Sequence, residues 1–352
     1  MHRFDYSFLK TASFPADIVS KASRIESMRG RGESVIRSHP AVVSDMEAAA
    51  RVMSMRESNA IEGIVTSDDR LMAIATGSTA PRGHSESEIA GYRDVLDIIR
   101  SRHDALSVDE RTILRLFSVM GAQSGGPTGY KTRDNAIVDV HGDGTRSVRF
   151  RPVSAAETPA AMEQLPLAYG EARDDMGVNN LLLIPCFILD FLCIHPFIDG
   201  NGRMSRLLTL LLLYQEGYDV GRYVSVEARM SATRDRYYEA LSASSEGWHE
   251  NGSDYIPFIS YMLGVLMMCY REFDSRSRAI EGSRMGKMDR VKGMVLNSVL
   301  PVSKSDLSSM MSDVSVTTIE AVLGKMVREG VVRKMGGNRN ARYIRASEEV
   351  RP

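Results

Sequence analysis

The sequence predicts a mainly α-helical protein with one small β-hairpin, followed by a smaller basic domain at the C-terminal end. Two apolar runs, from Leu181 to Ile194 and from Leu207 to Leu213, have the composition of buried helices. Apolar residues recur at helical spacing in several other segments. From Ser277 onward there are 14 lysines and arginines against 8 acidic residues, a net charge of +6 in a chain whose total is −1. This change in charge indicates a separate unit.

Length and composition place the chain among globular proteins of two or three domains. It has 352 residues, of which 43% are hydrophobic and 25% are charged. No apolar run is long enough to span a bilayer, and the first residues lack the layout of a signal peptide. Cys186, Cys193 and Cys269 fall in apolar helical patterns without the spacing of a zinc site. We therefore expect free thiols, a cytoplasmic location and no membrane partner.

Residues 1–80 are predicted to form a helical N-terminal region, in which Ser44 to Arg56 have clear helical character. A loop at 76–83, rich in glycine, threonine and proline, ends this region. Two amphipathic helices follow, from Glu86 to Arg102 and from Val108 to Met120, because their apolar residues recur every three or four positions.

Residues 125–133 interrupt the helical pattern with three glycines and a proline. Two short runs with strand composition follow, Ala136 to Val140 and Val148 to Arg151. They flank the polar turn His141 to Gly144. A turn with glycine between two such runs predicts a β-hairpin.

After the second apolar run, Val226 to Ser245 and Tyr255 to Phe273 are predicted to be helices, with Trp248 in the turn between them. Residues 276–286 are predicted to be a linker, because serine, arginine and glycine replace the apolar pattern there.

The last domain is predicted over 287–352. Its expected elements are a helix at Met288 to Leu300, a helix at Asp306 to Met311 capped by Ser303, a helix from Ser315 to Gly330, and a hairpin of 331–334 and 341–345. Three helices and a β-wing resemble a winged helix-turn-helix domain. The basic charge is typical of nucleic-acid binding, but such domains also serve in dimerisation and protein docking. DNA as a partner and a homodimer are both left open.

The most informative stretch is the polar segment His195 to Arg206, which lies between the two apolar runs. It is predicted to be a loop that leads into the N-terminus of the second buried helix. A helix N-terminus attracts anions, because its N–H groups are unpaired and its dipole is positive there. Gly200 and Gly202 would let phosphate oxygens approach the backbone without a Cβ in the way.

Four side chains of this segment supply what a polyphosphate substrate needs. Arg203 and Arg206 lie three residues apart, so their guanidinium groups point the same way and suit phosphate oxygens. Asp199 is a hard oxygen ligand of the kind that Mg²⁺ takes together with substrate phosphates. His195 can accept a proton near neutral pH. Each residue alone has an ordinary structural explanation, but the combination between two buried helices indicates a catalytic site.

The segment resembles the signature of the Fic family, H-P-F-x-[D/E]-G-N-G-R-x-x-R, at every specified position. The resemblance implies a protein adenylyltransferase, which moves AMP from ATP to a serine, threonine or tyrosine hydroxyl of a target protein or of the chain itself. It implies His195 as the general base and Asp199 as the Mg²⁺ ligand. The implied phosphate contacts are Gly200, Asn201, Gly202, Arg203 and Arg206.

A second match lies upstream, where Ser58 to Gly63 resembles the family's inhibitory signature, [S/T]-x-x-x-E-[G/N]. The resemblance implies that Glu62, near a helix end, pairs with Arg206 and occupies the place of the γ-phosphate of ATP. A carboxylate on a desolvated arginine competes directly with a phosphate. We therefore expect an autoinhibited enzyme with Ser58, Glu62 and Gly63 as its inhibitory residues.

The resemblance implies roles for two further regions. Tyr237 and Tyr238 match a tyrosine pair that lines the adenine pocket, with Tyr238 expected to stack on the base; packing of both rings in the core is the alternative. Ser245 stands where many relatives have an asparagine that touches adenine, which weakens the expectation of a strict ATP preference. The hairpin matches a flap that holds the target's backbone by strand addition, and a plain surface hairpin is the alternative.

The resemblance thus implies a Fic helical core with a hairpin flap over 81–275, preceded by an inhibitory region at 1–80. The leading function is autoinhibited AMP transfer that uses ATP and Mg²⁺. One alternative is a DNA-binding regulator whose core senses nucleotide. Another is an enzyme of the same fold that removes AMP from modified proteins, with Glu62 positioning a water. The intact His195 favours a transferase over a pure sensor.

Overall fold

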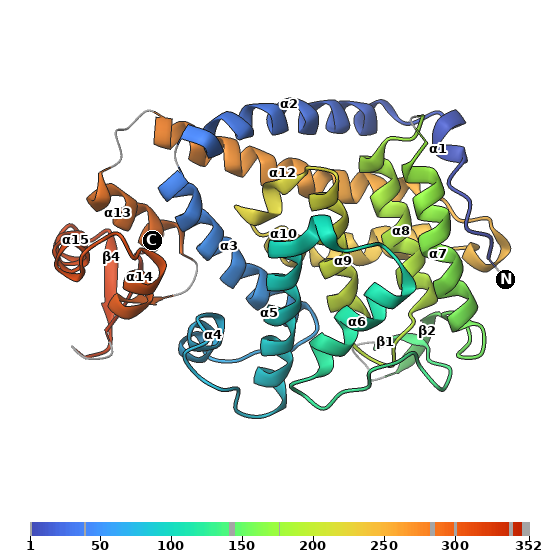
Figure 1. The fold of residues 1–352 in the computed structure, drawn as a ribbon, viewed down its shortest axis with the longest axis horizontal. Helices are drawn as coiled ribbons and strands as arrows, with labels where there is room; N and C mark the ends of the chain where they lie inside the picture. The colour runs from blue at the N-terminus through green and yellow to red at the C-terminus, as the bar shows by residue number, and fades with distance from the viewer. Residues whose placement is uncertain are drawn as a thin grey trace.

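The computed structural model describes residues 2–38, 40–140, 145–175, 177–281, 286–298, 301–337 and 341–346. This part of the chain is mainly α-helical, with one two-stranded and one three-stranded antiparallel sheet (Figure 1). None of its helices is long and apolar enough to cross a membrane. The elements of the larger, N-terminal unit are α1 (Phe8–Thr11), α2 (Ala16–Ser38), α3 (Pro40–Ile61), α4 (Asp68–Ala75), α5 (His84–Arg102), η1 (His103–Ala105), α6 (Glu110–Gly121), β1 (Ile137–Val140), β2 (Arg146–Phe150), α7 (Thr158–Arg173), α8 (Asn180–Ile194), α9 (Asn201–Gln215), η2 (Asp219–Arg222), α10 (Val226–Ala232), α11 (Arg234–Ser245), η3 (Trp248–Glu250) and α12 (Ile256–Glu281).

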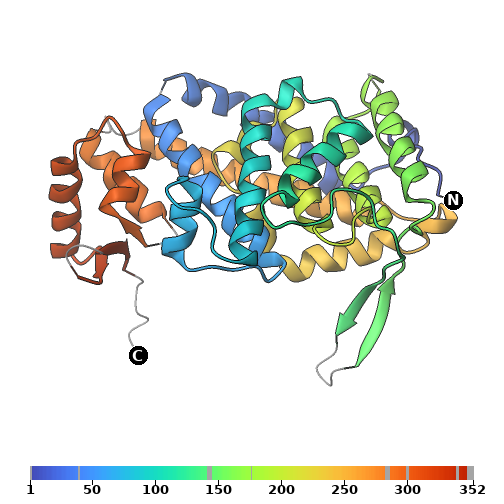
Figure 2. The same cartoon turned by 60° about the horizontal axis from the view of Figure 1, so that its bottom comes forward.

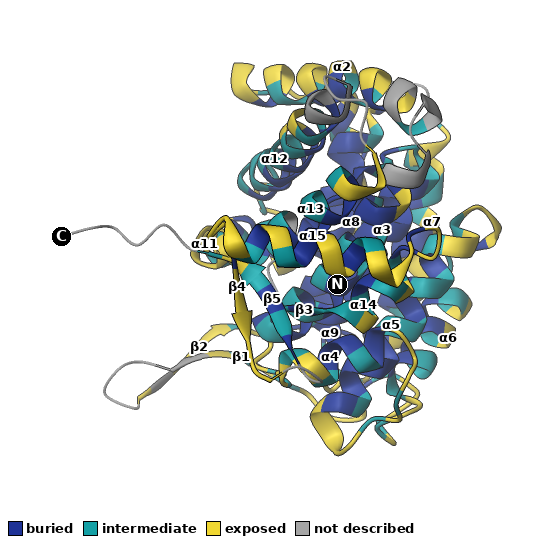
Figure 3. Cartoon of the chain, turned by 90° about the vertical axis from the view of Figure 1, so that its left-hand side faces the viewer, coloured by how far each residue is buried: buried dark blue, intermediate teal, exposed yellow. Residues whose placement is uncertain are grey.

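Helices α8 and α9 pack against each other at the centre of the larger unit. Leu181 to Ile194 of α8 and Arg203 to Tyr214 of α9 are buried throughout. Helices that are apolar on every side must be surrounded, and α5, α7, α11 and α12 contact this pair. Figure 3 shows both as buried ribbon in the interior. The two predicted core helices are confirmed, and the loop between them is held at both ends by the core.

Helix α2 lies in the region 1–80 that is predicted to be helical, although its bounds are not predicted, and helix α7 is not predicted from the sequence. Helix α2 lies along α12 (Figure 1) and buries Ile18 and Ile25. Its sequence is otherwise largely polar, so the apolar stripe is too narrow to be recognised. Helix α7 contains Pro159 in its first turn, where proline is tolerated, and the buried Pro166 inside it. The two prolines make this helix hard to recognise in the sequence, and its packing against α8 stabilises it.

Two predicted elements differ from the structure. The helix expected from Val226 to Ser245 is broken into α10 and α11 at Thr233, whose hydroxyl donates to the Arg229 carbonyl at 2.8 Å. Such local bonds compete with helix continuation. Helix α12 runs to Glu281, through the first part of the segment expected to be a linker. The stretch 276–281 contains no glycine or proline that would end the helix, and Gly282 lies outside the described residues.

Strands β1 and β2 form the predicted antiparallel hairpin, with Val138 opposite Val148. The hairpin extends away from the helical body (Figure 2). Both valines are exposed, at 42% and 48%. The predicted turn at 141–144 lies outside the described residues. An exposed strand pair of this kind can accept a further strand at its edge.

The C-terminal unit has its own hydrophobic core, built around Leu307, Val322 and Leu323. Its sheet has the strand order β3-β5-β4, with both pairings antiparallel. The elements are α13 (Lys287–Asn297), β3 (Val302–Ser303), α14 (Lys304–Met310), α15 (Val316–Arg328), β4 (Val332–Met335) and β5 (Arg342–Arg345). The predicted order of three helices and a terminal hairpin is present, with β3 as an additional short strand.

The C-terminal unit contacts the larger unit through α3 (Figure 1). Arg290 of α13 is 8% exposed and donates to the two carboxylate oxygens of Asp45 in α3, at 3.0 and 3.2 Å. The same guanidinium group donates to Asp313 at 2.7 and 3.1 Å. Ala49, one turn further along α3, packs against the C-terminal core. The first half of α3 therefore forms part of the interface.

Replacing Arg290 with alanine is expected to lower the free energy of unfolding by about 3–5 kcal/mol, because Asp45 would be left buried without its partner. Urea unfolding followed by circular dichroism would measure the loss. Lys292→Ala on the same helix is the matched control, because its ion pair with Asp289 is partly exposed. Equal stability of the two variants would show that the interface does not depend on this ion pair.

Candidate active site

Residues 195–200, the motif loop, join α8 to α9 in a sharp turn. His195 and Gly200 have left-handed backbone conformations, with φ of 51° and 83°. The Asn201 side chain accepts from the Phe197 N–H at 3.0 Å and donates to the Phe197 carbonyl at 2.8 Å. The Phe197 ring is buried and stacks on Phe117 of α6. The Asn201 amide and the Phe197 ring thus fix the loop. The Asn201 side chain forms its hydrogen bonds within this loop.

His195 follows the last residue of α8 and lines a cavity. Its Nδ1 lies 3.3 Å from the Leu192 carbonyl oxygen. Because a carbonyl only accepts, Nδ1 carries the proton and Nε2 is the free proton acceptor. Burial, with a smaller contribution from the charge of Lys131, lowers the pKa of His195 to about 4 against the opposing effects of the Leu192 carbonyl and two carboxylates. The imidazole is therefore neutral near pH 7, as a general base must be.

The N-terminus of α9 faces the carboxylate of Glu62. A Cβ added at Gly202 would overlap Glu62 Oε1 and would lie 3.2 Å from Arg206 Nη1. Only glycine therefore lets a carboxylate lie against the first turn of the helix. Negative charge is stabilised there by unpaired N–H groups and by the helix dipole. This place is an anion site, and Glu62 occupies it.

Arg206 is 2% exposed and holds Glu62 from inside the protein. Its Nη2 donates to Glu62 Oε1 and to the Ser58 carbonyl, both at 2.8 Å, and its Nε donates to the Ser58 hydroxyl at 2.8 Å. Its Nη1 is buried and has no hydrogen-bond partner among the described residues. The expected contact between Glu62 and Arg206 is present, and Nη1 remains available to a further acceptor.

A glycine sets the position of Glu62. Gly63 has a φ of 76°, and the Ile64 N–H donates back to the Asn59 carbonyl at 3.0 Å. This arrangement is typical of a helix that ends at a glycine in the left-handed conformation. Helix α3 therefore stops at Ile61, and Glu62 follows it directly.

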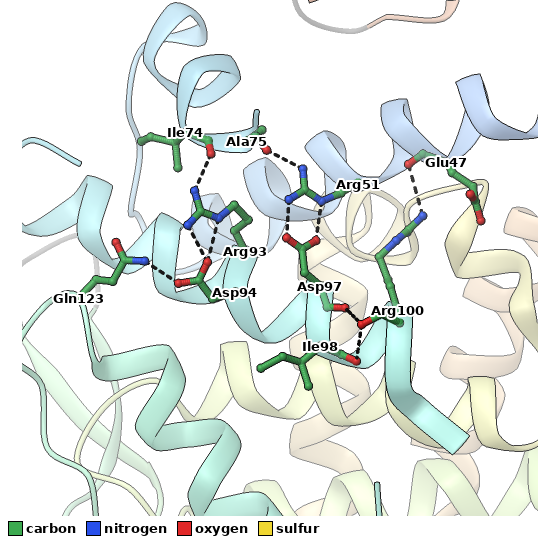
Figure 4. A network of polar contacts seen from close by, with 11 residues as sticks. Glu47, Arg51, Ile74, Ala75, Arg93, Asp94, Asp97, Ile98, Arg100 and Gln123 are labelled. Atoms are coloured by element: carbon green, nitrogen blue, oxygen red, sulfur yellow. Dashed lines mark hydrogen bonds and ion pairs between the residues drawn. The ribbon is translucent and has the colours of Figure 1, made fainter. Parts of the chain in front are cut away.

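Helix α3 is held against α5 by the ion pair and hydrogen bonds in Figure 4. Arg51 donates to both carboxylate oxygens of Asp97 in α5 at 2.5 Å, and to the Ala75 carbonyl at 2.6 Å. Arg100 of α5 donates to the Glu47 carbonyl at 3.4 Å. A bidentate arginine–carboxylate pair is among the stronger surface interactions. The helix that carries Glu62 is therefore part of the core assembly.

Arg203 and Asp199 lie outside the cavity lining. Arg203 is 4% exposed, and its Nη2 donates to Glu88 of α5 at 2.9 Å and lies 3.6 Å from Asp199. The Asp199 side chain is 80% exposed. No group of three or more histidine, cysteine or acidic residues that could hold a metal occurs in the described ranges. A single accessible carboxylate suits a Mg²⁺ ion that also binds substrate phosphates.

The cavity has a volume of 310 Å³, and its mostly apolar walls come from helices α8 and α11 and from the base of the hairpin. Six of the predicted site residues line it: Glu62, His195, Gly202, Arg206, Tyr237 and Tyr238. Ser245, at the position where many relatives have an asparagine, lines it as well. Ser58, Gly63, Asp199, Gly200, Asn201 and Arg203 are not in its lining. The other residues that line it are Ala136, Ile137, Arg149, Phe150, Leu189, Leu192, Cys193, Leu241 and Ser242.

Sequence reasoning missed Arg149. Its guanidinium carbon lies 5.3 Å from the centre of the Tyr238 ring, and that of Arg234 lies 5.6 Å from the same centre. Tyr237 is only 3% exposed, so the alternative that its ring packs in the core fits Tyr237 better than it fits Tyr238. An arginine in a surface hairpin gives no sequence signal, because only the placement of the hairpin base over α11 brings it to the cavity.

Comparison with known proteins places these features in a family. Residues 104–213, which include the motif loop, match the Fic/DOC family. A Fido domain-containing protein of Dictyostelium discoideum is 39% identical over 101 residues, which are 28% of this chain and 66% of that protein. Protein adenylyltransferase Fic of Drosophila yakuba is 41% identical over 69 residues, which are 20% of this chain and 12% of that protein. The chain therefore spans less than two thirds of these relatives' lengths.

Two solved structures have the same fold over longer stretches. A Fic family protein of Desulfovibrio desulfuricans aligns over 97% of this chain and 99% of that chain, with a TM-score of 0.63 and 18% identity. A Fic domain-containing signaling protein of Bacteroides thetaiotaomicron aligns over 75% of this chain and 100% of that chain, with a TM-score of 0.61 and 20% identity. At these identities the likeness shows the fold alone. The match over residues 104–213 and the 39% identity to the Dictyostelium protein identify the chain as a Fic/DOC family protein.

Proposed function

We propose that the chain is a protein adenylyltransferase that is restrained by Glu62. The observation that carries the proposal is that His195 and Arg206 line one cavity. In that cavity the Glu62 carboxylate forms an ion pair with the guanidinium group of Arg206. A base and a phosphate-binding arginine are two groups that the reaction needs, and the Glu62 carboxylate competes with the phosphate for that arginine. The partial match to the Drosophila protein adenylyltransferase supports the same reaction.

In this reaction the phosphates of ATP would bind at the N-terminus of α9, where backbone N–H groups and Arg206 neutralise their charge. His195 Nε2 would take the proton of the target hydroxyl, whose oxygen attacks the α-phosphorus. The bond between the α-phosphorus and the oxygen that leads to the β-phosphate breaks, and pyrophosphate leaves. AMP remains on the target oxygen. Positioning and charge neutralisation supply most of the catalysis.

Asp199 would hold the Mg²⁺ that accompanies the nucleotide, and the ion would supply charge neutralisation at the phosphates. Arg203 would add a second positive charge near the same end of α9. Gly200 and Gly202 would keep the backbone open to phosphate oxygens. Asn201 would contribute by holding the motif loop, since its side-chain atoms are bonded to Phe197.

The nucleobase would lie in the apolar part of the cavity, against Tyr238 and near Ser245. Arg149 and Arg234 lie close to the Tyr238 ring, so that ring already has cationic groups beside it. The exposed hairpin would hold the target by strand addition next to the cavity, because Ile137 at its base is part of the lining.

The test of this function is the position of the label that reaches protein. Glu62→Gly, with His195 intact or replaced by alanine, would be incubated with cell lysate and with ATP labelled on either the α- or the γ-phosphate. Because kinases in the lysate transfer the γ-phosphate by themselves, only label that depends on His195 counts. We expect such label from α-labelled ATP only, together with release of pyrophosphate. His195-dependent label from γ-labelled ATP would show phosphoryl transfer and would overturn the proposal.

Two alternatives have distinct outcomes. Removal of AMP from a modified protein by the unmodified chain, and the loss of that activity in Glu62→Gly, would indicate the reverse reaction. ATP binding without any labelling would favour a nucleotide sensor that acts through the C-terminal unit. The strand order β3-β5-β4 and the helix order favour a winged helix-turn-helix there, and Lys325 and Arg328 in the last turn of α15 give it a basic helix end.

A further inference from the structure

Lys131 lies between α6 and β1 and is 3% exposed, although lysine is rarely buried to this extent. Its Nζ donates to the carbonyl of Ile194 at 3.0 Å and to Oδ1 of Asn135 at 3.1 Å. Its backbone N–H donates to the carbonyl of Pro196 at 2.9 Å. One residue therefore holds the carbonyl groups on both sides of His195.

This contact is made where the backbone is strained. His195 has a φ of 51°, a conformation that costs a residue with a side chain about 1–3 kcal/mol and persists only when its surroundings enforce it. Asn201 holds the far side of the loop through Phe197. Lys131 supplies the corresponding restraint on the near side.

We propose that Lys131 is a positioning residue for His195, which fixes the direction of the imidazole and places a positive charge beside it. The inference rests on the proposed function, in which His195 is the base. Lys131 does not touch the cavity, so it would act on the reaction only through the motif loop.

A residue that only held the loop in place by hydrogen bonds would not need the charge of Lys131. Both acceptors of its ammonium group are neutral oxygens, so the charge is buried at a cost that an amide side chain would avoid. Burial lowers the pKa of Lys131 to about 8, with Asp134 acting in the opposite direction. The ammonium form therefore still predominates at pH 7.

Charges from several elements face His195. Glu62 at the end of α3 and Asp199 in the motif loop raise its pKa, whereas Lys131 lowers it. Arg206 of α9 and Arg149 of β2 line the same cavity. Removal of the Lys131 charge should therefore raise the pKa of His195, and its replacement by another cation should not.

The first experiment does not depend on activity. The His195 ring would be titrated by NMR in protein with labelled histidine, with His195→Ala identifying its signal among the 7 histidines. Lys131→Met is expected to raise the measured pKa by about 1 unit, and Lys131→Arg to leave it unchanged. Lys21→Met on α2 is the control. It removes a lysine that is distant in sequence from Lys131 and that pairs with Asp17.

The second experiment measures AMP transfer in the Glu62→Gly background. Lys131→Met is expected to lower kcat about 10- to 100-fold with the KM for ATP unchanged, because a misplaced base costs rate and not nucleotide binding. Lys131→Arg should restore most of kcat. Lys131→Gln, which keeps a donor without the charge, should show the pKa shift with a smaller loss of kcat, and it carries the test if the methionine variant does not fold.

An unchanged His195 titration together with an unchanged kcat in Lys131→Met or Lys131→Gln would overturn the inference. Failure of Glu62→Gly itself to transfer AMP would instead count against the proposed function. The NMR titration would still decide the role of Lys131 in that case.

Discussion

Replacing Glu62 with glycine is expected to raise AMP transfer roughly 10- to 100-fold above the unmodified protein. The substitution removes the acceptor that holds Arg206 Nη2 at 2.8 Å and clears the carboxylate from Gly202. A hydrogen bond between charged groups contributes about 1.5–3 kcal/mol, and the exposure of the Glu62 side chain, 34%, favours the lower part of that range. Transfer of α-labelled AMP to protein measures the effect.

Glu57→Gly is the matched control for this substitution. Glu57 lies on the same helix and its carboxylate is 3.7 Å from Arg56, away from the arginine of the motif. A glycine at Glu57, inside α3, costs the helix at least as much as one at Glu62, which follows α3, and it leaves the Glu62 carboxylate in place. Equal labelling by the unmodified protein, Glu57→Gly and Glu62→Gly would show that Glu62 does not restrain the enzyme.

Replacing His195 with alanine in the Glu62→Gly background is expected to lower AMP transfer about 10²- to 10⁴-fold, the usual contribution of a general base. ATP binding, measured by calorimetry, should be unchanged, because the phosphate site lies at the N-terminus of α9 and not on the imidazole. His84→Ala is the control, since that ring is 71% exposed on α5. Full activity of His195→Ala would require another proton acceptor.

The pH dependence follows from the same residue. Burial lowers the pKa of His195 to about 4, so the neutral form of the imidazole is kept down to that pH and is lost as the pH falls through it. The activity of Glu62→Gly should therefore stay level from pH 7 to about pH 5 and decline below. A decline centred near pH 6.5 would show an ordinary, solvated histidine.

Apart from the contact between Glu62 and Arg206, which the family resemblance implied, the predicted features that the structure shows are local ones. The helices around the motif loop are recognisable because continuous apolar runs can only be buried, and the hairpin is recognisable because glycine lies between two strand-forming runs. The features that were missed, or predicted without their bounds, depend on distant partners. Helix α7 exists in spite of Pro159 and Pro166, and α2 needs α12 to bury its narrow stripe.

The sequence by itself determined which reactive groups are present and that His195, Asp199, Arg203 and Arg206 share one segment, because their spacing lies within a few residues of chain. Only the tertiary structure decided which of them face the cavity. The pairing of Arg206 with Glu62, 144 residues away, was expected only through the family resemblance, and the contact of Arg203 with Glu88, 115 residues away, was not expected at all. Such contacts depend on how α3 and α5 pack against α9, and packing between distant helices leaves no local pattern in the sequence.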